Sequence, residues 1–232
     1  MNIAVLNIAT GRYIDLFERS KQHISDNFLT SHNIDLFLFT DSDREFSDNR
    51  INIKKYFIKK RGYPGDTLFR YHYFLLAEKE LLKYDYVYYI DVDMNVVSSV
   101  GEEIFGDLVA TLHPGYYNRS GATFESRLES TAYVDPNDTG PYFCGGFQGG
   151  SPKFYLNASR EISNNINLDG KKNIIALWHD ESHWNSFLRK QEPTLTLSPE
   201  FCYPQENYSW LKEFKDTKKI VCLIKDEKKL RS

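Results

Sequence analysis

Two aspartates separated by one residue interrupt an apolar, aromatic segment near the middle of the chain. The segment is YDYVYYIDVDMNVV (residues 84–97), and the pair is Asp91 and Asp93. Alternate side chains of an extended segment lie on one side, so the two carboxylates can converge. Ligands of open α/β sheets bind beyond the carboxyl ends of strands, and hard divalent cations such as magnesium or manganese take carboxylate and phosphate oxygens. The spacing therefore predicts a metal-assisted site, with a solvated strand end as the alternative.

The segment Trp178-His179-Asp180-Glu181-Ser182-His183 holds two histidines and two acids. His179 and His183 are four residues apart and would share a helix face, as in the HExxH zinc helix. The glutamate is at the third position rather than the second, where that motif has its general base. The alternative is a helix N-terminus with acids favourably placed in its first turn. In both cases the acidic pair after Trp178 is a candidate site.

Two glycine pairs flank Phe147 and Gln148, in the segment GGFQGGS just before an expected helix. Glycine permits close approach of the backbone, although a bulge and a turn would use the same residues. The segment is neither GxGxxG nor a P-loop, because no GKS or GKT follows. Nucleotide binding here would therefore not use those phosphate cradles.

Apolar periodicity indicates the elements that must position these residues. Strands are expected at 2–9, 34–40, 51–58, 84–97, 107–113, 142–147, 194–198 and 219–224. Helices are expected at 13–29, from Asp66 or Thr67 to about Lys83, from Ser151 onward and at 179–190, with a long loop or a short β excursion at 114–141. Alternating strands and helices in the first half favour a mainly parallel sheet. The final segment KDEKKLRS is typical of a solvated, charged terminus.

Composition excludes several classes. The 232 residues suit one large domain, and a net charge of −3 provides no global basic field for nucleic acid. Three cysteines far apart in sequence argue against a disulfide framework or a cysteine zinc site. No apolar run approaches the roughly 20 residues of a membrane span, and the N-terminus resembles a buried strand rather than a signal peptide. The aromatic fraction, 15%, is high, and aromatic side chains fill cores and also line binding sites.

Taken in order, these segments resemble family 6 glycosyltransferases, the retaining enzymes that include the histo-blood group A and B transferases and α-1,3-galactosyltransferase. The matching segments are ATGRY at 9–13, YIDVDM at 89–94, HPGYY at 113–117, STAYV at 130–134, PYFCGGFQGGS at 141–151, WHDESHWN at 178–185 and LSPEF at 197–201. The resemblance implies an α/β fold, the Rossmann-like nucleotide-sugar glycosyltransferase fold (type A) with a mixed central sheet. It also implies one catalytic domain over 1–232, with a nucleotide-binding part at about 1–97, an acceptor-binding part at about 98–218 and a tail at 219–232.

The resemblance also implies roles for individual residues. The catalytic residue would be Glu181, as a nucleophile or as a stabiliser of an oxocarbenium-like transition state. The metal ligands would be Asp91 and Asp93. The donor-binding residues would be Ile8, Ala9, Thr10, Tyr13, Tyr63, Thr67, Arg70, Asp91, Val92, Asp93, Cys144, Gly145, Gly146, Asp180, Lys225 and Arg231. The acceptor-binding residues would be His113, Thr123, Trp178 and Glu181.

The implied reaction is retaining α-1,3 transfer from a UDP-sugar to an oligosaccharide acceptor, with Mn²⁺ as the cofactor and Mg²⁺ or another divalent cation as the alternative. Gly146, the smallest residue at the family's donor-selecting position, favours N-acetylgalactosamine over galactose. Gly115 resembles the blood-group enzymes, which implies a Fucα1,2-Gal acceptor. The charge and the lack of a long apolar run predict no nucleic-acid partner and no membrane span, the oligomeric state stays open, and the missing anchor of the vertebrate enzymes favours a cytoplasmic location.

The chain departs from the family pattern at two positions. Pro204 replaces an acceptor-contacting aspartate, and Ile8 replaces a donor-stacking phenylalanine. Many short prokaryotic relatives carry Asn-x-Asn and work without metal, whereas this chain keeps Asp-x-Asp, which favours metal dependence. Two alternatives of other classes stand beside this interpretation: a zinc hydrolase using His179 and His183, and a non-catalytic carbohydrate-binding module.

Overall fold

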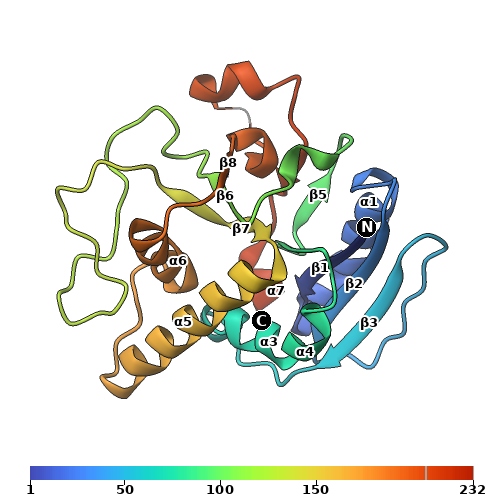
Figure 1. The fold of residues 1–232 in the computed structure, drawn as a ribbon, viewed down its shortest axis with the longest axis horizontal. Coiled ribbons are helices and arrows are strands. Elements are labelled where there is room, and N and C mark those ends of the chain that lie inside the picture. Colours follow the sequence, from blue (N-terminus) through green and yellow to red (C-terminus); the bar gives the residue numbers. More distant parts are fainter. Residues whose placement is uncertain (207, 232) are drawn as a thin grey trace.

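A mixed sheet forms the centre of the molecule (Figure 1). The computed structural model describes residues 1–206 and 208–231. Within these residues the sheet has seven strands in the order β3-β2-β1-β4-β7-β6-β8. Their bounds are β1 (Asn2–Ile8), β2 (Asn33–Thr40), β3 (Asn52–Phe57), β4 (Tyr86–Ile90), β6 (Leu108–Leu112), β7 (Phe143–Gly150) and β8 (Leu195–Leu197). Strands β3, β2, β1 and β4 run parallel, whereas β7 is antiparallel to β4 and β6, so the expected mixed sheet is confirmed.

A small second sheet brings the C-terminal segment to the end of β4. It consists of β5 (Met94–Val96), β10 (Ile220–Cys222) and β9 (Tyr203–Pro204). Strand β10 pairs antiparallel with β5, and the Leu223 amide donates to the Asp93 carbonyl at 3.0 Å. The last residues of the chain are therefore held beside the two aspartates.

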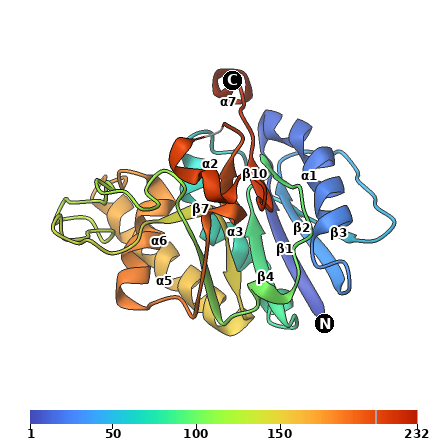
Figure 2. The ribbon, with the colours of Figure 1, turned by 90° about the horizontal axis from the view of Figure 1, so that it is seen from above.

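Helices cover both faces of the main sheet. The helices of the chain are α1 (Ile14–Asn27), α2 (Gly65–Leu68), α3 (Arg70–Leu76), α4 (Glu78–Leu81), α5 (Pro152–Lys171), α6 (His179–Lys190) and α7 (Glu227–Arg231), of which α7 lies beyond the end of the sheet rather than on a face. Alternation along β1 separates the two cores: Ile3 and Val5 pack with α1, and Leu6 packs with α3, α5 and α6. In Figure 2, α7 and the C-terminal end lie opposite the N-terminus, beyond the carboxyl end of β1.

The helix expected from Asp66 or Thr67 to about Lys83 is three short helices. The breaks fall at Phe69 (φ −92°, ψ 13°) and Ala77 (φ −100°, ψ 8°), where the backbone leaves helical geometry. Each break turns the chain. Within α3, Arg70, Tyr71 and Phe74 are all buried and share one face of the helix.

The glycine-rich segment belongs to strand β7, which continues to Gly150, and the pairing of β7 with β6 shifts register between Ala110 and Leu112, so a bulge or irregularity interrupts the ladder beside the first glycine pair. A Cβ at Gly149 would lie 2.3 Å from the Val87 carbonyl oxygen, and one at Gly150 would lie 2.2 Å from that of Asp107. Gly150 also has φ +138°, which L side chains rarely adopt. These glycines thus allow the backbone of β7 to pass close to its neighbours.

A long irregular segment connects β6 to β7. Residues 113–142 contain neither helix nor strand, so the long loop expected at 114–141 is confirmed. No helix within the described residues is long and apolar enough to cross a membrane.

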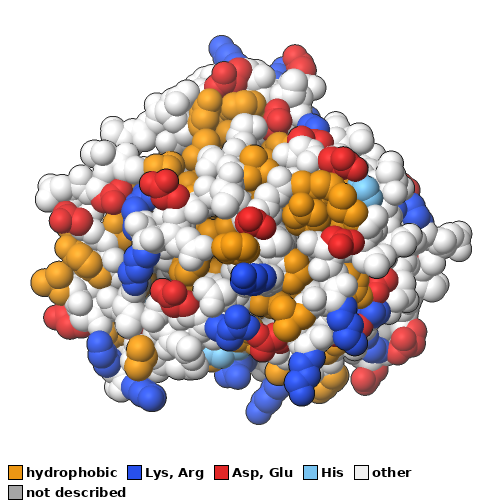
Figure 3. Space-filling view, in the orientation of Figure 1, with side chains coloured by type: hydrophobic (Ala, Val, Ile, Leu, Met, Phe, Trp, Pro, Cys, Tyr) orange, Lys and Arg blue, Asp and Glu red, His pale blue; other side chains and the backbone are white. Residues whose placement is uncertain are grey.

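On the face shown in Figure 3, positive, negative and hydrophobic side chains of the described residues are interspersed rather than gathered into one broad charged field.

Candidate active site

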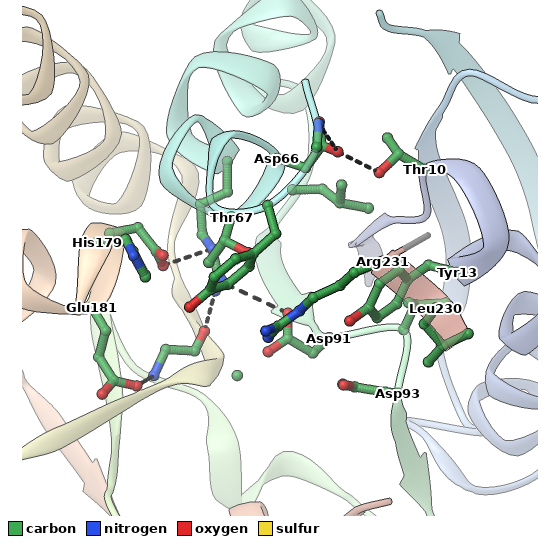
Figure 4. Close-up of a pocket in the computed structure, with 18 of the residues that line it drawn as sticks. Thr10, Tyr13, Asp66, Thr67, Asp91, Asp93, His179, Glu181, Leu230 and Arg231 are labelled. Carbon is green, nitrogen blue, oxygen red and sulfur yellow. Dashed lines mark hydrogen bonds and ion pairs between the residues drawn. The ribbon is translucent and has the colours of Figure 1, made fainter. Parts of the chain in front are cut away.

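A pocket of about 300 Å³ opens where the carboxyl end of β4, the start of β7, the start of α6 and the C-terminal segment meet (Figure 4). Most of the site residues expected from the sequence line it: Ile8, Thr10, Tyr13, Tyr63, Thr67, Arg70, Asp91, Val92, Asp93, Gly145, Gly146, Trp178, Asp180, Glu181, Lys225 and Arg231. The chain thus assembles residues from six separate segments around one cavity.

The two aspartates lie in the turn between β4 and β5, each next to a cation. The side chain of Asp91 is 32% exposed; it accepts a hydrogen bond from the Tyr89 hydroxyl, and Arg70 Nη2 lies 3.5 Å from its Oδ1. The side chain of Asp93 is only 7% exposed, and the ammonium of Lys225 contacts its Oδ2. Two carboxylates close together repel unless positive charge is nearby, and here side chains provide it.

This donor set fits a hard divalent cation. Both aspartates offer carboxylate oxygens to the same pocket. The Lys225 ammonium contacts Asp93 and occupies a place where a cation is favoured. Among the described residues, no group of three or more His, Cys, Asp or Glu side chains could hold a metal by itself. The protein would therefore contribute two carboxylates, and the other ligands would be substrate oxygens and water.

A second acidic pair faces the pocket from the start of α6. Asp180 is buried, and its Oδ2 lies 2.8 Å from Arg70 Nε. Glu181 accepts a hydrogen bond from the Gly145 amide at 2.7 Å. Burial raises the pKa of Asp180 to about 7, and the guanidinium of Arg70 opposes this rise. Desolvation likewise raises the pKa of Glu181 to about 7, and hydrogen bonds from the Gly145 amide and the Tyr142 hydroxyl oppose it.

Arg70 links the two acidic pairs. Its guanidinium is buried and lies 4.5 Å from the centre of the Tyr89 ring. Besides Asp91 and Asp180, it contacts the Gly145 carbonyl, to which Nη1 donates at 2.5 Å. The N–H of the same residue donates to Glu181, so Gly145 connects Arg70 to the glutamate.

Asn185 fixes the register of α6 against β7, a role that its position in the sequence does not reveal. Its side chain is fully buried; its Oδ1 accepts from the Phe143 amide, and its Nδ2 donates to the Phe143 carbonyl, both at 2.8 Å. Nδ2 also donates to the Glu181 carbonyl at 2.9 Å. Glu181 and Asn185 are four residues apart on α6 and so lie on one side of the helix. Phe143 and Gly145 are two residues apart on β7 and lie on one side of the strand. The contact between Asn185 and Phe143 therefore holds Glu181 opposite Gly145.

The two histidines of the predicted helix have different surroundings. His179 has φ +53°, lines the pocket and packs edge-on against the Tyr63 ring, with 5.2 Å between ring centres. His183 is buried, its Nε2 lies 3.8 Å from Asp169, and burial lowers its pKa to about 4. The structure therefore does not present them as a pair of ligands at one site.

The charged C-terminus crosses the pocket instead of extending into solvent. The guanidinium of Arg231 lies 3.6 Å from the centre of the Tyr63 ring, and the ammonium of Lys225 lies 5.5 Å from that of Tyr13. Leu230 also lines the cavity. The segment is therefore only partly a solvated terminus: residues 226–229 are exposed, whereas Lys225, Leu230 and Arg231 line the pocket.

The acceptor-binding residues expected from the sequence form a polar and aromatic wall next to the pocket. Trp178 is 46% exposed, and its Nε1 donates to Thr123 Oγ1 at 2.9 Å. The Tyr116 hydroxyl lies 3.1 Å from the same oxygen, and the His113 ring lies 5.1 Å from the Tyr116 ring. Trp178 belongs to both the wall and the pocket, so the two regions are continuous.

Two of the expected donor-binding residues lie elsewhere. Ala9 and Cys144 are buried in the apolar core and do not line the cavity. His179, expected only as a zinc ligand, also lines the pocket, and several other lining residues were missed: Lys60, Gly62, Asp66, Tyr89 and Leu230. Asp66 accepts hydrogen bonds from Thr10 Oγ1 and the Gly62 amide, at 2.8 and 3.0 Å. A turn with an aspartate was the only sequence signal for it, and that signal indicates a helix cap.

A mixed sheet with a carboxylate pair at the end of β4 is consistent with a type A glycosyltransferase fold. Residues 72–232 match the model of glycosyltransferase family 6, and the chain belongs to this family. The resemblance inferred from the sequence is therefore confirmed.

Curated relatives extend the comparison. The Escherichia coli O-antigen biosynthesis glycosyltransferase WbnI is 28% identical over 233 residues, which cover 99% of this chain and 96% of that protein. Globoside α-1,3-N-acetylgalactosaminyltransferase 1 of Gallus gallus is 28% identical, over 88% of this chain and 62% of that protein. Histo-blood group ABO system transferase 1 of Rattus norvegicus is 41% identical, over 54% of this chain and 37% of that protein.

Proposed function

We propose that this glycosyltransferase is a retaining α-1,3-hexosyltransferase. It moves N-acetylgalactosamine, and less readily galactose, from a UDP-sugar to a galactoside acceptor of the Fucα1,2-Gal type. The supporting observation is one pocket that combines the pair Asp91 and Asp93, the residue Glu181, and cations from the C-terminal segment. Relatives named as α-1,3-N-acetylgalactosaminyltransferases support the linkage and the sugar.

The charges of the pocket suit a nucleoside diphosphate leaving group. A divalent cation, manganese in this proposal, would supply Lewis-acid charge at Asp91 and Asp93 when bound. Lys225 and Arg231 would neutralise the developing charge of UDP, since both side chains already lie over the pocket. The same C-terminal segment would exclude water and so limit hydrolysis of the donor.

Glu181 would act on the sugar itself. Its carboxylate faces the pocket and is held by the Gly145 amide. The anomeric carbon develops positive charge in the transition state, and a carboxylate opposite the leaving group stabilises that charge or traps the sugar covalently. Asp180, fixed by Arg70, would hydrogen-bond the hydroxyls of the donor sugar.

Release of UDP tests the proposed function. With manganese present, the protein should release UDP from UDP-N-acetylgalactosamine, and a fucosylated galactoside should increase the rate. Linkage analysis of the product should show an α-1,3 bond. A protein that binds the galactoside but releases no UDP from any UDP-hexose would behave as a carbohydrate-binding module, contrary to the proposal.

Gly146 provides a test of the donor. A Cβ there would lie 2.7 Å from the Met94 sulfur and 3.1 Å from Asp91 Oδ2, so Gly146→Ala fills space on the donor side of the metal pair. We expect the ratio of kcat/KM for UDP-N-acetylgalactosamine to that for UDP-galactose to fall by about tenfold, the scale typical of one methyl group in a pocket.

Gly170→Ala is the matched control for this test, because a Cβ at Gly170 meets no atom within 4 Å. The two ratios should be measured by UDP release at subsaturating donor. An unchanged ratio in an active Gly146→Ala protein would show that position 146 does not set the donor preference.

A further inference from the structure

The loop that carries Thr123 reaches the acceptor wall without any regular secondary structure of its own. From 113 to 142 the chain contains neither helix nor strand, yet the side chain of Thr123 accepts a hydrogen bond from Trp178. Trp178 is half-exposed, and a single hydrogen bond at such a place adds little to order. Some other group must hold these two segments together.

A buried carboxylate lies directly behind this contact. Glu125 is 2% exposed; its Oε2 accepts from the Leu177 amide at 2.8 Å and from Arg127 Nη2 at 2.6 Å. Its Oε1 accepts from Arg127 Nε and from the Arg127 amide, both at 2.9 Å. The guanidinium then continues to the opposite segment, where Nη2 donates to the Ile175 carbonyl at 2.6 Å.

The pair Glu125 and Arg127 therefore joins two loops at the residues next to the acceptor wall. Glu125 is two residues after Thr123, and Leu177 immediately precedes Trp178. A bidentate arginine–carboxylate pair has a defined geometry, so it fixes the relative position of the two loops more closely than a single hydrogen bond would. Neither Glu125 nor Arg127 lines the donor pocket.

A second buried carboxylate anchors the loop further along. Asp169, near the end of α5, is 1% exposed and accepts from Ser130 Oγ at 2.6 Å and from the Thr131 amide at 2.8 Å. This anchor holds the far part of the loop on α5. The near part, which contains Thr123, is held by the Glu125–Arg127 pair and by Phe124, whose ring lies 5.1 Å from that of Tyr142.

We infer that Glu125 and Arg127 are positioning residues for the acceptor: their ion pair locks Thr123 and Trp178 into the wall that receives the acceptor sugar. This inference rests on the proposed function, because it takes that wall as the acceptor site. Loss of the pair should weaken acceptor binding and leave the donor pocket intact. A residue that served only general stability would lower both to the same extent.

The test compares binding of two probes to the full chain by calorimetry: a fucosylated galactoside in the presence of UDP, and UDP itself with manganese. In Glu125→Gln the side-chain oxygen for the Leu177 amide remains, and the charge opposite Arg127 is lost. The Kd of the galactoside should rise about tenfold, while the Kd of UDP stays within about twofold.

Glu129→Gln is the matched control, because it removes an exposed carboxylate from the same loop. Arg127→Lys is the second variant: the arginine side chain is 49% exposed, so the substitution should not prevent folding, yet it removes the bidentate pair. It should raise the Kd of the galactoside as well, by a smaller factor.

The outcomes separate the inference from the function on which it rests. If the parent protein binds the galactoside and both variants bind it equally well, or if both lose galactoside and UDP in the same proportion, the inference is wrong and the proposed function stands. A parent protein that binds UDP but no galactoside overturns the proposed acceptor and the inference together.

Discussion

Asp93→Asn should abolish the response to manganese and reduce kcat/KM for the UDP-sugar by at least about 100-fold, the range seen when a group at a metal site or facing transition-state charge is lost. Asparagine has the size of aspartate but only one neutral oxygen to offer a cation. Asp93 is the more buried member of the pair, and its carboxylate holds the Lys225 ammonium at the pocket. The substitution therefore removes charge from the centre of the donor site without removing volume.

Two measurements check this result. UDP release should be followed as manganese is titrated, and manganese binding in the presence of UDP should be measured by calorimetry. Asp43→Asn, at an exposed aspartate outside the pocket, should leave both unchanged. If Asp93→Asn keeps the manganese response and the donor affinity of the parent protein, the metal assignment is wrong.

Elements defined by local signals could be predicted from the sequence. Ser151 before Pro152 indicated the start of α5, and the acids after Trp178 indicated the start of α6 at His179. The strand before Asp91 was visible from its aromatic and β-branched residues. These signals are local because caps, turns and apolar alternation depend on near neighbours.

The parts that depend on distant partners could not be predicted. The roles of Asn185 and Glu125 come from backbone groups at Phe143 and Leu177, and no spacing within either segment indicates these contacts. A cap signal at Asp66 or Thr67 similarly favoured one helix to about Lys83, whereas the backbone leaves helical geometry at Phe69 and at Ala77. Tertiary contacts outweighed local preference at each of these places.

The resemblance to family 6 supplied what local signals lacked at the C-terminus. Charge alone indicated a solvated segment, but the family pattern placed Lys225 and Arg231 over the donor. The structure shows why this arrangement is favourable: the tail is tied to β5 through β10, and its cations meet Asp93 and the ring of Tyr63. A buried carboxylate without a cation is costly, so the Lys225 ammonium stabilises Asp93. The face of the Tyr63 ring attracts the Arg231 guanidinium.

Glu181→Gln should lower kcat by about 1,000-fold while the Kd of the UDP-sugar changes by less than about threefold, because the negative charge matters mainly in the transition state. Glutamine has the same shape, and its side-chain oxygen can still accept from the Gly145 amide, as Glu181 does at 2.7 Å. The register set by Asn185 also remains, so the pocket keeps its form. Only the charge opposite the leaving group disappears.

The pH profile gives an independent check on the same charge. Desolvation raises the pKa of Glu181 to about 7, so the carboxyl is protonated below this pH and ionised above it. Because the ionised form stabilises positive charge on the sugar, kcat/KM of the parent protein should rise between pH 6 and pH 8, and this rise should become smaller in Glu181→Gln, where Asp180, whose pKa burial also raises to about 7, still titrates. Glu192→Gln, at an exposed glutamate just beyond α6, should keep the parent profile. Equal losses in kcat and donor binding, with the pH dependence unchanged, would instead assign Glu181 a structural role in which its bond to Gly145 only joins α6 to β7.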